Sequence, residues 1–308
     1  MNGTLLVEDL VKTFRGTRAV DSISFAVSRG SFTALLGPNG SGKSTTLKLC
    51  TNMLQPDSGR VLLNGIDVAE DTVEALSDVG CVIESPEIYP DVTARRYLDY
   101  LGKISGMTAE DAKSETERVL GIVGMSDSRS DRRIGSYSKG MKQRIVLAQS
   151  LLGDPEVLIL DEPTSGLDPK GSAEFNSILK KLNREGKTIL MSSHMLHEVE
   201  GLCDSAVIID CGRTVRRGAM EEIIRRSTVM ISVIGQIEKE TISMVSRIPG
   251  VIEVGSSGNE MSIRIDGGPE LQAELVKTLT DSGIRVYSVC KKDPLEEVFM
   301  DVTGGNSR

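Results

Sequence analysis

Tryptophan is absent from this chain of 308 residues, and histidine occurs only at positions 194 and 197. All aromatic residues together make up 3% of the sequence. No apolar run approaches about 18 residues, the length that a membrane-spanning helix needs, so we expect no such helix. The first residues lack the basic flank and apolar stretch of a secretory signal peptide, so we expect none. These absences predict a soluble chain.

Cysteine is also sparse and scattered. The five cysteines, at positions 50, 81, 203, 211 and 290, include no Cys-x-x-Cys pair. An odd number of widely spaced cysteines without an export signal is typical of free thiols in a reducing compartment. A zinc site built on cysteine is therefore not expected.

Basic residues are too few to dominate the charge. The chain has 36 Lys and Arg against 44 Asp and Glu, for a net charge of -8. No segment forms a basic domain, so nucleic acid is not an expected partner. Hydrophobic residues are 39% of the chain, which is enough to build cores. The length suits about two domains.

Short apolar runs alternate with helical patterns over residues 1–225, which predicts an α/β domain around a mostly parallel sheet. Strands are expected at 5–7, 21–27, 31–36, 61–63, 79–83, 157–160, 187–192 and 206–210. Helical spacing appears at 44–53 and then dominates from about residue 86 to 154, with helices expected at 93–104, 109–123 and 138–152. We interpret 86–154 as a helical subdomain inserted between strands.

The pattern restarts over residues 226–308. Strand-like segments and helical segments follow one another in the order βαββαβ, at 228–234, 239–248, 252–254, 261–265, 270–279 and 285–289. This order is typical of a small α+β domain of the ferredoxin-like type. A last helix is expected at 294–302.

A glycine-rich loop lies between the expected strand 31–36 and the next helix. It fits the phosphate-binding pattern G-x-x-x-x-G-K-[ST], with the residues Gly37, Pro38, Asn39, Gly40, Ser41, Gly42, Lys43 and Ser44. The glycines let backbone N–H groups converge on phosphate oxygens, and the helix N-terminus adds a partial positive charge. Lys43 is expected to reach the β- and γ-phosphates of ATP, and the Ser44 hydroxyl to bind Mg²⁺. A glycine-rich turn without a ligand is the disfavoured alternative.

Two carboxylates, Asp161 and Glu162, end the apolar run 157–160. The C-terminal edge of a buried strand is where α/β sheets place ligand chemistry. We expect Asp161 to hold Mg²⁺ and Glu162 to polarise an attacking water as general base. An ordinary strand end would be the simpler interpretation without the phosphate loop.

Several motifs in one order resemble the ATP-binding subunits of ABC transporters over about residues 4–220. They are the phosphate loop, the segment 137–144, the acidic strand, the segment 165–168 and His194. The resemblance implies a P-loop NTPase core of ABC type that hydrolyses ATP with Mg²⁺. It also implies that Thr45 belongs to the nucleotide-binding loop, and that the working unit is a homodimer or a pair of such subunits.

The resemblance assigns roles to residues outside the phosphate loop. Ser138 and Gly140 match the signature that faces the γ-phosphate of a second subunit's ATP, although Ser138 is also a good helix N-cap. His194 resembles the switch histidine that bonds the γ-phosphate. With His197 it forms an i, i+3 pair, and metal binding there is disfavoured because no third ligand is evident. Asp168 resembles the aspartate that acts across the dimer, and it also suits an N-cap.

Two further positions follow from the same resemblance. Phe14 lies where the family has an aromatic residue that stacks on adenine, the alternative being a core phenylalanine. Glu84, which follows the strand 79–83, stands where the family has glutamine. It is expected to offer an oxygen to Mg²⁺ or water while adding negative charge near ATP.

The end of the chain narrows the type of transporter. Residues 293–304 resemble the ending of exporter ATPases that serve drugs, peptide antibiotics or polysaccharides. The expected partner is a separate integral membrane subunit, and the expected location is the cytoplasmic face of the membrane. The alternatives are an importer ATPase and a soluble mechanical ATPase acting on DNA or ribosomes. No coiled-coil arm separates Lys43 from Asp161, which disfavours the chromosome-organising kind.

Overall fold

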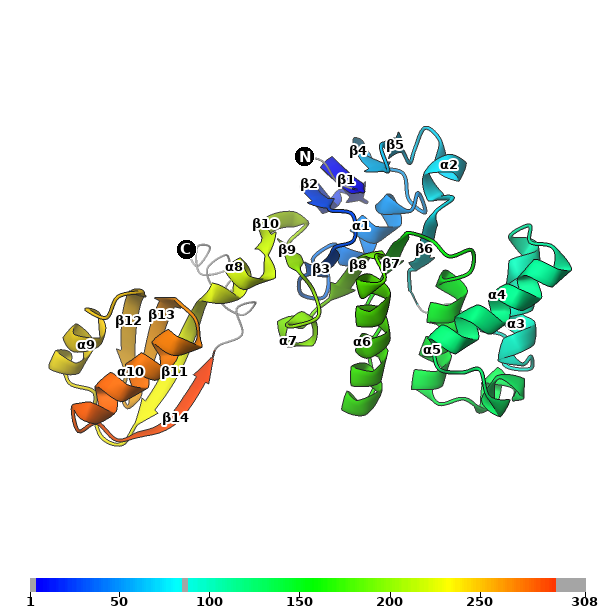
Figure 1. Cartoon of the computed structure of the whole chain (residues 1–308). Coiled ribbons are helices and arrows are strands. Elements are labelled where there is room, and N and C mark those ends of the chain that lie inside the picture. The colour runs from blue at the N-terminus through cyan, green and yellow to red at the C-terminus, as the bar shows by residue number, and fades with distance from the viewer. Residues whose placement is uncertain (1–3, 85–87, 292–308) are drawn as a thin grey trace. The chain divides into compact units, whose positions relative to one another are not determined.

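The computed structural model describes residues 4–84 and 88–291, which form two compact units (Figure 1). The first unit comprises Met1–His194 and Gly201–Arg217, and the second comprises Met195–Glu200 and Gly218–Arg308. No helix in the described ranges is both long and apolar enough to cross a bilayer.

A six-stranded sheet forms the centre of the first unit, in the order β10-β9-β3-β8-β7-β6. The neighbours from β9 to β6 pair in parallel, as the buried apolar runs predicted. The strands are β3 (Phe32–Leu36), β6 (Val79–Val82), β7 (Val157–Leu160), β8 (Thr188–Ser193), β9 (Ser205–Asp210) and β10 (Arg213–Ala219). All residues of β3, β7 and β8 are buried, which explains their continuous apolar character.

A second sheet of the first unit is antiparallel, with the order β2-β1-β4-β5. Its strands are β1 (Leu5–Phe14), β2 (Thr17–Val27), β4 (Ser58–Leu63) and β5 (Ile66–Asp67). Leu5 and Phe25 from this sheet join Leu47 of helix α1 (Lys43–Cys50) and Ile159 of β7 in one apolar core. The core therefore surrounds the helix that follows the phosphate loop.

The helical subdomain has the three predicted helices, with bounds that differ by at most two residues. They are α3 (Ala94–Ile104), α4 (Ala109–Ile122) and α5 (Lys139–Ser150). Each begins after a hydroxyl residue, Thr93, Thr108 or Ser138, whose side chain accepts a backbone N–H of the first turn. The short elements α2 (Thr72–Leu76), η1 (Ser128–Asp131) and η2 (Ile134–Ser136), and the long α6 (Pro169–Arg184), complete the helices of this unit.

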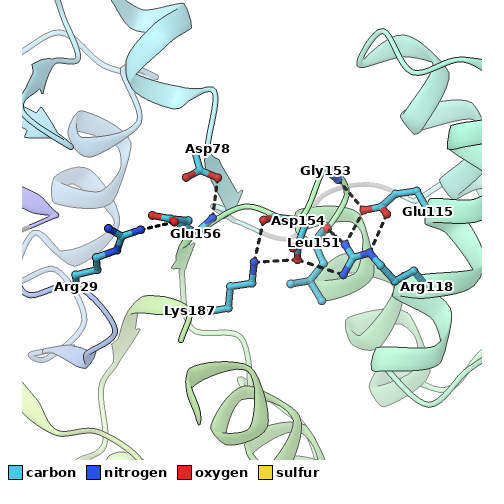
Figure 2. Close-up of polar contacts among 9 residues, drawn as sticks. All are labelled: Arg29, Asp78, Glu115, Arg118, Leu151, Gly153, Asp154, Glu156 and Lys187. Carbon is cyan, nitrogen blue, oxygen red and sulfur yellow. Dashed lines mark hydrogen bonds and ion pairs between the residues drawn. The ribbon is translucent and has the colours of Figure 1, made fainter. Parts of the chain in front are cut away.

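Polar contacts join α4 to the loop between α5 and β7 (Figure 2). Arg118 donates to Leu151 O at 2.8 Å and lies 3.3 Å from Asp154 Oδ1. Asp154 also accepts from Lys187 at 2.8 Å, and the backbone N–H of Gly153 donates to Glu115 at 2.9 Å. One short loop thus ties the helical subdomain to the start of β7, the strand that Asp161 follows.

The second unit has the βαββαβ order that the sequence predicted. Its sheet is antiparallel in the order β12-β13-β11-β14. Val245, Leu275 and Leu279 from its helices pack with Val229 and Ile231 of β11 in one apolar core. The elements are α7 (Leu196–Val199), α8 (Met220–Arg225), β11 (Arg226–Val233), α9 (Lys239–Val245), β12 (Val251–Ser257), β13 (Glu260–Asp266), α10 (Pro269–Asp281) and β14 (Val286–Lys291). The helix expected at 294–302 and the motif 293–304 lie outside the described residues.

Candidate functional site

The phosphate loop connects the buried strand β3 to α1, as the motif requires. Two glycines of the loop stand where a side chain would collide with neighbouring backbone. A Cβ on Gly37 would lie 2.3 Å from the carbonyl oxygen of Ile209, and one on Gly42 would lie 2.4 Å from that of Ala19. Gly42 is also the N-cap of α1 with φ 103°, a conformation that favours glycine. Lys43, Ser44 and Thr45 form the first turn of α1.

Lys43 is buried, with 5% of its side chain exposed. Its ammonium donates to the carbonyl oxygens of Gly37 at 2.9 Å and Pro38 at 3.1 Å. It also lies 3.3 Å from Glu162 Oε1. A buried cation needs such partners, and these place the charge inside the curve of the loop.

Asp161 and Glu162 follow β7 at the C-terminal edge of the parallel sheet. Ser192 of β8 joins the two residues: its hydroxyl donates to Asp161 Oδ1 at 2.6 Å and accepts from the Glu162 N–H at 2.8 Å. Ser192 belongs to none of the sequence motifs. The signal was its position at the end of the next apolar run, which brings it to the same sheet edge.

His194 follows β8 and lies beside Glu162. The distance between His194 Nδ1 and Glu162 Oε2 is 3.2 Å. Glu162 therefore lies between Lys43 on one carboxylate oxygen and His194 on the other. His197 lies in α7, and the structure does not describe its side chain. Among the residues that are described, no three His, Cys, Asp or Glu side chains cluster in a way that could hold a metal ion alone.

The turn between β9 and β10 supports the phosphate loop from a part of the sequence that carried no motif. The Gly212 N–H donates to Ser41 O at 3.0 Å, and the Asp21 N–H donates to Gly212 O at 2.7 Å. Asp21 also bonds Arg213 and Arg18, and these two guanidinium groups lower the pKa of its carboxyl group. A chain of polar contacts thus links β2, this turn and the loop.

Ser138 and Asp168 lie together in a second cluster. Ser138 caps α5 by accepting the Met141 N–H at 3.3 Å, and Asp168 caps α6 by accepting the Gly171 N–H at 3.0 Å. Both N-cap expectations are confirmed. The two caps line a surface pocket of about 510 Å³, which Gly140 and Lys139 also line. The residues lining this pocket include none of the phosphate loop.

Glu84 and Phe14 have environments that the sequence did not reveal. Glu84 forms an ion pair with Lys48 of α1. Phe14 is 43% exposed, and Lys12 Nζ lies 5.7 Å from the centroid of its ring. The alternative of a core phenylalanine is therefore wrong, because the ring lies at the surface with Lys12 over it.

The loop and the acidic edge suit a nucleotide with its metal ion. Within the described residues, the Ser41 hydroxyl is buried without a hydrogen-bond partner, as expected of a group that awaits an anionic oxygen. Open space surrounds Gly40, where a Cβ would meet nothing within 4 Å. The hydroxyl of Ser44 and the carboxylate of Asp161 are the hard oxygen donors that Mg²⁺ prefers when phosphate completes its shell.

Comparison with known proteins identifies the family. A family model described as "ABC transporter" matches residues 20–165. The linearmycin resistance ATP-binding protein LnrL of Bacillus subtilis (strain 168) is 32% identical over 312 residues, which cover 99% of each chain. The bacitracin transport ATP-binding protein BcrA of Bacillus licheniformis is 32% identical over 311 residues, covering 100% of this chain and 99% of its own. Among solved structures, cbiO1 from Clostridium perfringens, described as part of the ABC transporter complex cbiONQ, has a TM-score of 0.67 and 28% identity. It covers 81% of this chain and 97% of its own.

With a phosphate loop, an acidic strand end and relatives that match it from end to end, this chain belongs to the ATP-binding subunits of ABC transporters.

Proposed function

We propose that this Mg²⁺-dependent ATP hydrolase energises an exporter from the cytoplasmic face of the membrane. The support is the similarity, over nearly the whole chain, to proteins named for linearmycin resistance and bacitracin transport. The ending 293–304 points to the same group by its sequence. The single observation that carries the chemistry is the placement of Glu162 between Lys43 and His194.

ATP binds at the loop through backbone N–H groups and a few side chains. The loop residues 37–42 surround the phosphates, Lys43 donates to the β- and γ-phosphates, and Ser44 and Thr45 begin the helix whose N-terminus faces them. Ser44 and Asp161 would hold the Mg²⁺, which when bound would neutralise phosphate charge. Ser192 keeps the Asp161 carboxylate in place by donating its hydroxyl hydrogen.

Glu162 is the general base. Its carboxylate accepts a proton from the water that attacks the γ-phosphate, and His194 holds the carboxylate and contacts the phosphate. Lys43 neutralises Glu162 when no phosphate is present, since their charged atoms lie 3.3 Å apart. When the Lys43 ammonium binds phosphate instead, the Glu162 carboxylate is freed to contact water.

A second subunit completes each site. Ser138 and Gly140 at the start of α5, together with Asp168, bind across the dimer to the partner's nucleotide. The pocket that these residues line lacks the phosphate loop, which supports a role toward another chain. ATP binding then favours the closed dimer and hydrolysis reopens it.

The remaining assigned residues act at the ends of the nucleotide. Phe14 stacks on adenine with its exposed face. Glu84 stands near the phosphates and offers an oxygen to water or metal. The predicted accessory domain, residues 226–308, lies within the second unit, which begins earlier, at Gly218, and also includes Met195–Glu200. We assign it as an accessory domain of the exporter ATPase.

Affinity isolation from detergent-solubilised membranes tests the partner. We expect a separate integral membrane chain to co-purify with tagged wild-type protein, and to remain with Lys43→Ala as the matched control for specific docking. Inverted vesicles carrying the pair should take up the substrate on addition of ATP, since export from the cell is uptake into inverted vesicles. Recovery of ribosomes or DNA without a membrane chain would overturn the transporter assignment. Substrate uptake into right-side-out vesicles would assign the chain to an importer.

A further inference from the structure

Glu84 is a third acidic residue at the sheet edge where Asp161 and Glu162 follow β7. β6 lies beside β7 in parallel, with Val82 opposite Leu160. The Asp161 N–H donates to Val82 O at 2.8 Å, so the segments that follow β6 and β7 leave the sheet side by side. Glu84, two residues after Val82, therefore follows the same edge as Asp161 and Glu162.

Helix α1 supplies a lysine to each of the two glutamates at this edge. Lys43 lies 3.3 Å from Glu162, and Lys48 forms an ion pair with Glu84. Ser44 and Lys48 are four residues apart, so they lie on the same face of α1, one turn from each other. The ion pair thus holds Glu84 toward the face of α1 on which Ser44 and Lys48 both lie.

The backbone at Glu84 shows that its position is constrained. Its φ is 61°, in the left-handed region that side-chain-bearing residues seldom adopt. Glu162 has φ 42° in the same region. Such conformations persist where surrounding contacts impose them. Seven other non-glycine residues in the described ranges share this region, so the strain supports the constraint on Glu84 and does not by itself mark a ligand. Lys48 keeps only 25% of its side chain exposed while reaching Glu84, which itself is 67% exposed.

Charge explains why the acid needs this lysine. ATP brings several negative charges to the sheet edge that Asp161, Glu162 and Glu84 follow, and like charges repel. A neutral amide at position 84 would add no charge to this edge, whereas the carboxylate does.

We propose that Lys48 is a positioning residue for the ATPase site, which neutralises Glu84 and holds it toward the face of α1 that carries Ser44. The inference rests on the proposed nucleotide site. Its consequence is specific: removing Lys48 harms nucleotide binding only while residue 84 is an acid.

A double-mutant cycle tests this dependence. The readout is the equilibrium affinity for a fluorescent ATP analogue in excess EDTA, where no Mg²⁺ masks the charge of Glu84. Lys48→Met should weaken binding about three- to fivefold, the range of one partly exposed ion pair. In the Glu84→Gln background the same change should alter affinity less than about twofold. Lys48→Arg keeps the charge and should restore affinity to within about twofold of wild type.

Matched controls separate this effect from general loss of charge or fold. Lys103→Met breaks the exposed pair between Lys103 and Asp99 in α3 and should leave affinity unchanged. Equal weakening by Lys48→Met in both backgrounds, or none in either, would overturn the proposal, because Lys48 would not act through Glu84. Wild-type protein that binds no nucleotide would instead refute the proposed function, and the inference with it. Unchanged melting temperatures of all variants establish that folding is intact.

Discussion

Lys43 Nζ and Glu162 Oε1 lie 3.3 Å apart, in contact across the gap between the phosphate loop and the acidic end of β7. The lysine is buried and its other partners are two backbone carbonyl oxygens. The lysine that we propose to bind phosphate and the carboxylate that we propose to activate water are therefore electrostatic partners. If the proposal holds, a change at either residue should alter how the other meets phosphate.

Lys43→Ala should remove high-affinity nucleotide binding. The change deletes the buried ammonium and with it the charge-assisted hydrogen bonds to phosphate, for an expected loss of about 100-fold or more in affinity. Isothermal titration with Mg-ATP measures the loss. Affinity within about threefold of wild type would show that the loop does not bind phosphate through Lys43.

Gly42→Ala should destabilise the chain in the absence of ligand. A Cβ there would lie 2.4 Å from the backbone oxygen of Ala19, and φ 103° disfavours any side chain. We expect a loss of about 2 kcal/mol in the free energy of unfolding. Gly121→Ala in α4 is the control, because its Cβ meets nothing within 4 Å and helix propensity should raise stability by about 0.5–1 kcal/mol. Urea denaturation of both variants tests the contrast, and equal effects would refute it.

Arg118→Met should loosen the junction drawn in Figure 2. The change removes the hydrogen bonds to Leu151 O and Glu115 and leaves a carboxylate that is 17% exposed without its cation. We expect a loss of about 1–3 kcal/mol in the free energy of unfolding. Lys181→Met breaks a pair whose side chains are 69% and 52% exposed, and should cost less than about 0.5 kcal/mol. Similar losses in both variants would show that the junction is no stronger than a surface pair.

The same junction predicts a dependence on pH. The hydrogen bond from Arg118 lowers the pKa of the Glu115 carboxyl group below its ordinary value of 4.5. A carboxyl group whose pKa is lower in the folded chain stabilises the fold above its unfolded pKa, and this contribution disappears as pH falls through the folded pKa. The stability gap between wild type and Arg118→Met should therefore be full at neutral pH and shrink below about pH 4.5. A gap that grows with acid would contradict the assigned cause.

Phe14→Ala should weaken binding of ATP while sparing binding of tripolyphosphate. Stacking of a base on an aromatic ring contributes about 1–3 kcal/mol, so ATP affinity should fall about fivefold or more. Phe14→Tyr keeps the flat face and serves as the control. Competition titrations with the two ligands test the assignment, and a parallel loss for both would assign Phe14 to the fold rather than to adenine.

The sequence predicted those parts of the site that lie within one continuous segment better than the contacts between segments. The phosphate loop and β7 are local patterns, and β7 has the predicted bounds, 157–160. The contacts between segments were not predictable in the same way. Lys48 and Glu84 are 36 residues apart, and their pair depends on how α1 packs beside the end of β6.

The antiparallel sheet shows the same limit in the fold. Alternating apolar residues in 21–27 indicated a half-buried strand, but such alternation does not show which strand pairs with it. β1 pairs with both β2 and β4, and shifts of register between Val7 and Thr13 break its pattern. The parallel core was predictable because its strands are buried on both faces and therefore read as continuous apolar runs.

We propose that two copies of this site close on ATP and that hydrolysis at Glu162 reopens them. Glu162→Gln removes the base and also the negative charge that opposes the γ-phosphate, so ATP should be held and the closed dimer should accumulate. Gel filtration of this variant with Mg-ATP is the most direct measurement. We predict a species of twice the monomer mass that forms with ATP but not ADP, together with loss of turnover. A variant that stays monomeric at saturating ATP and hydrolyses it at the wild-type rate would contradict the account.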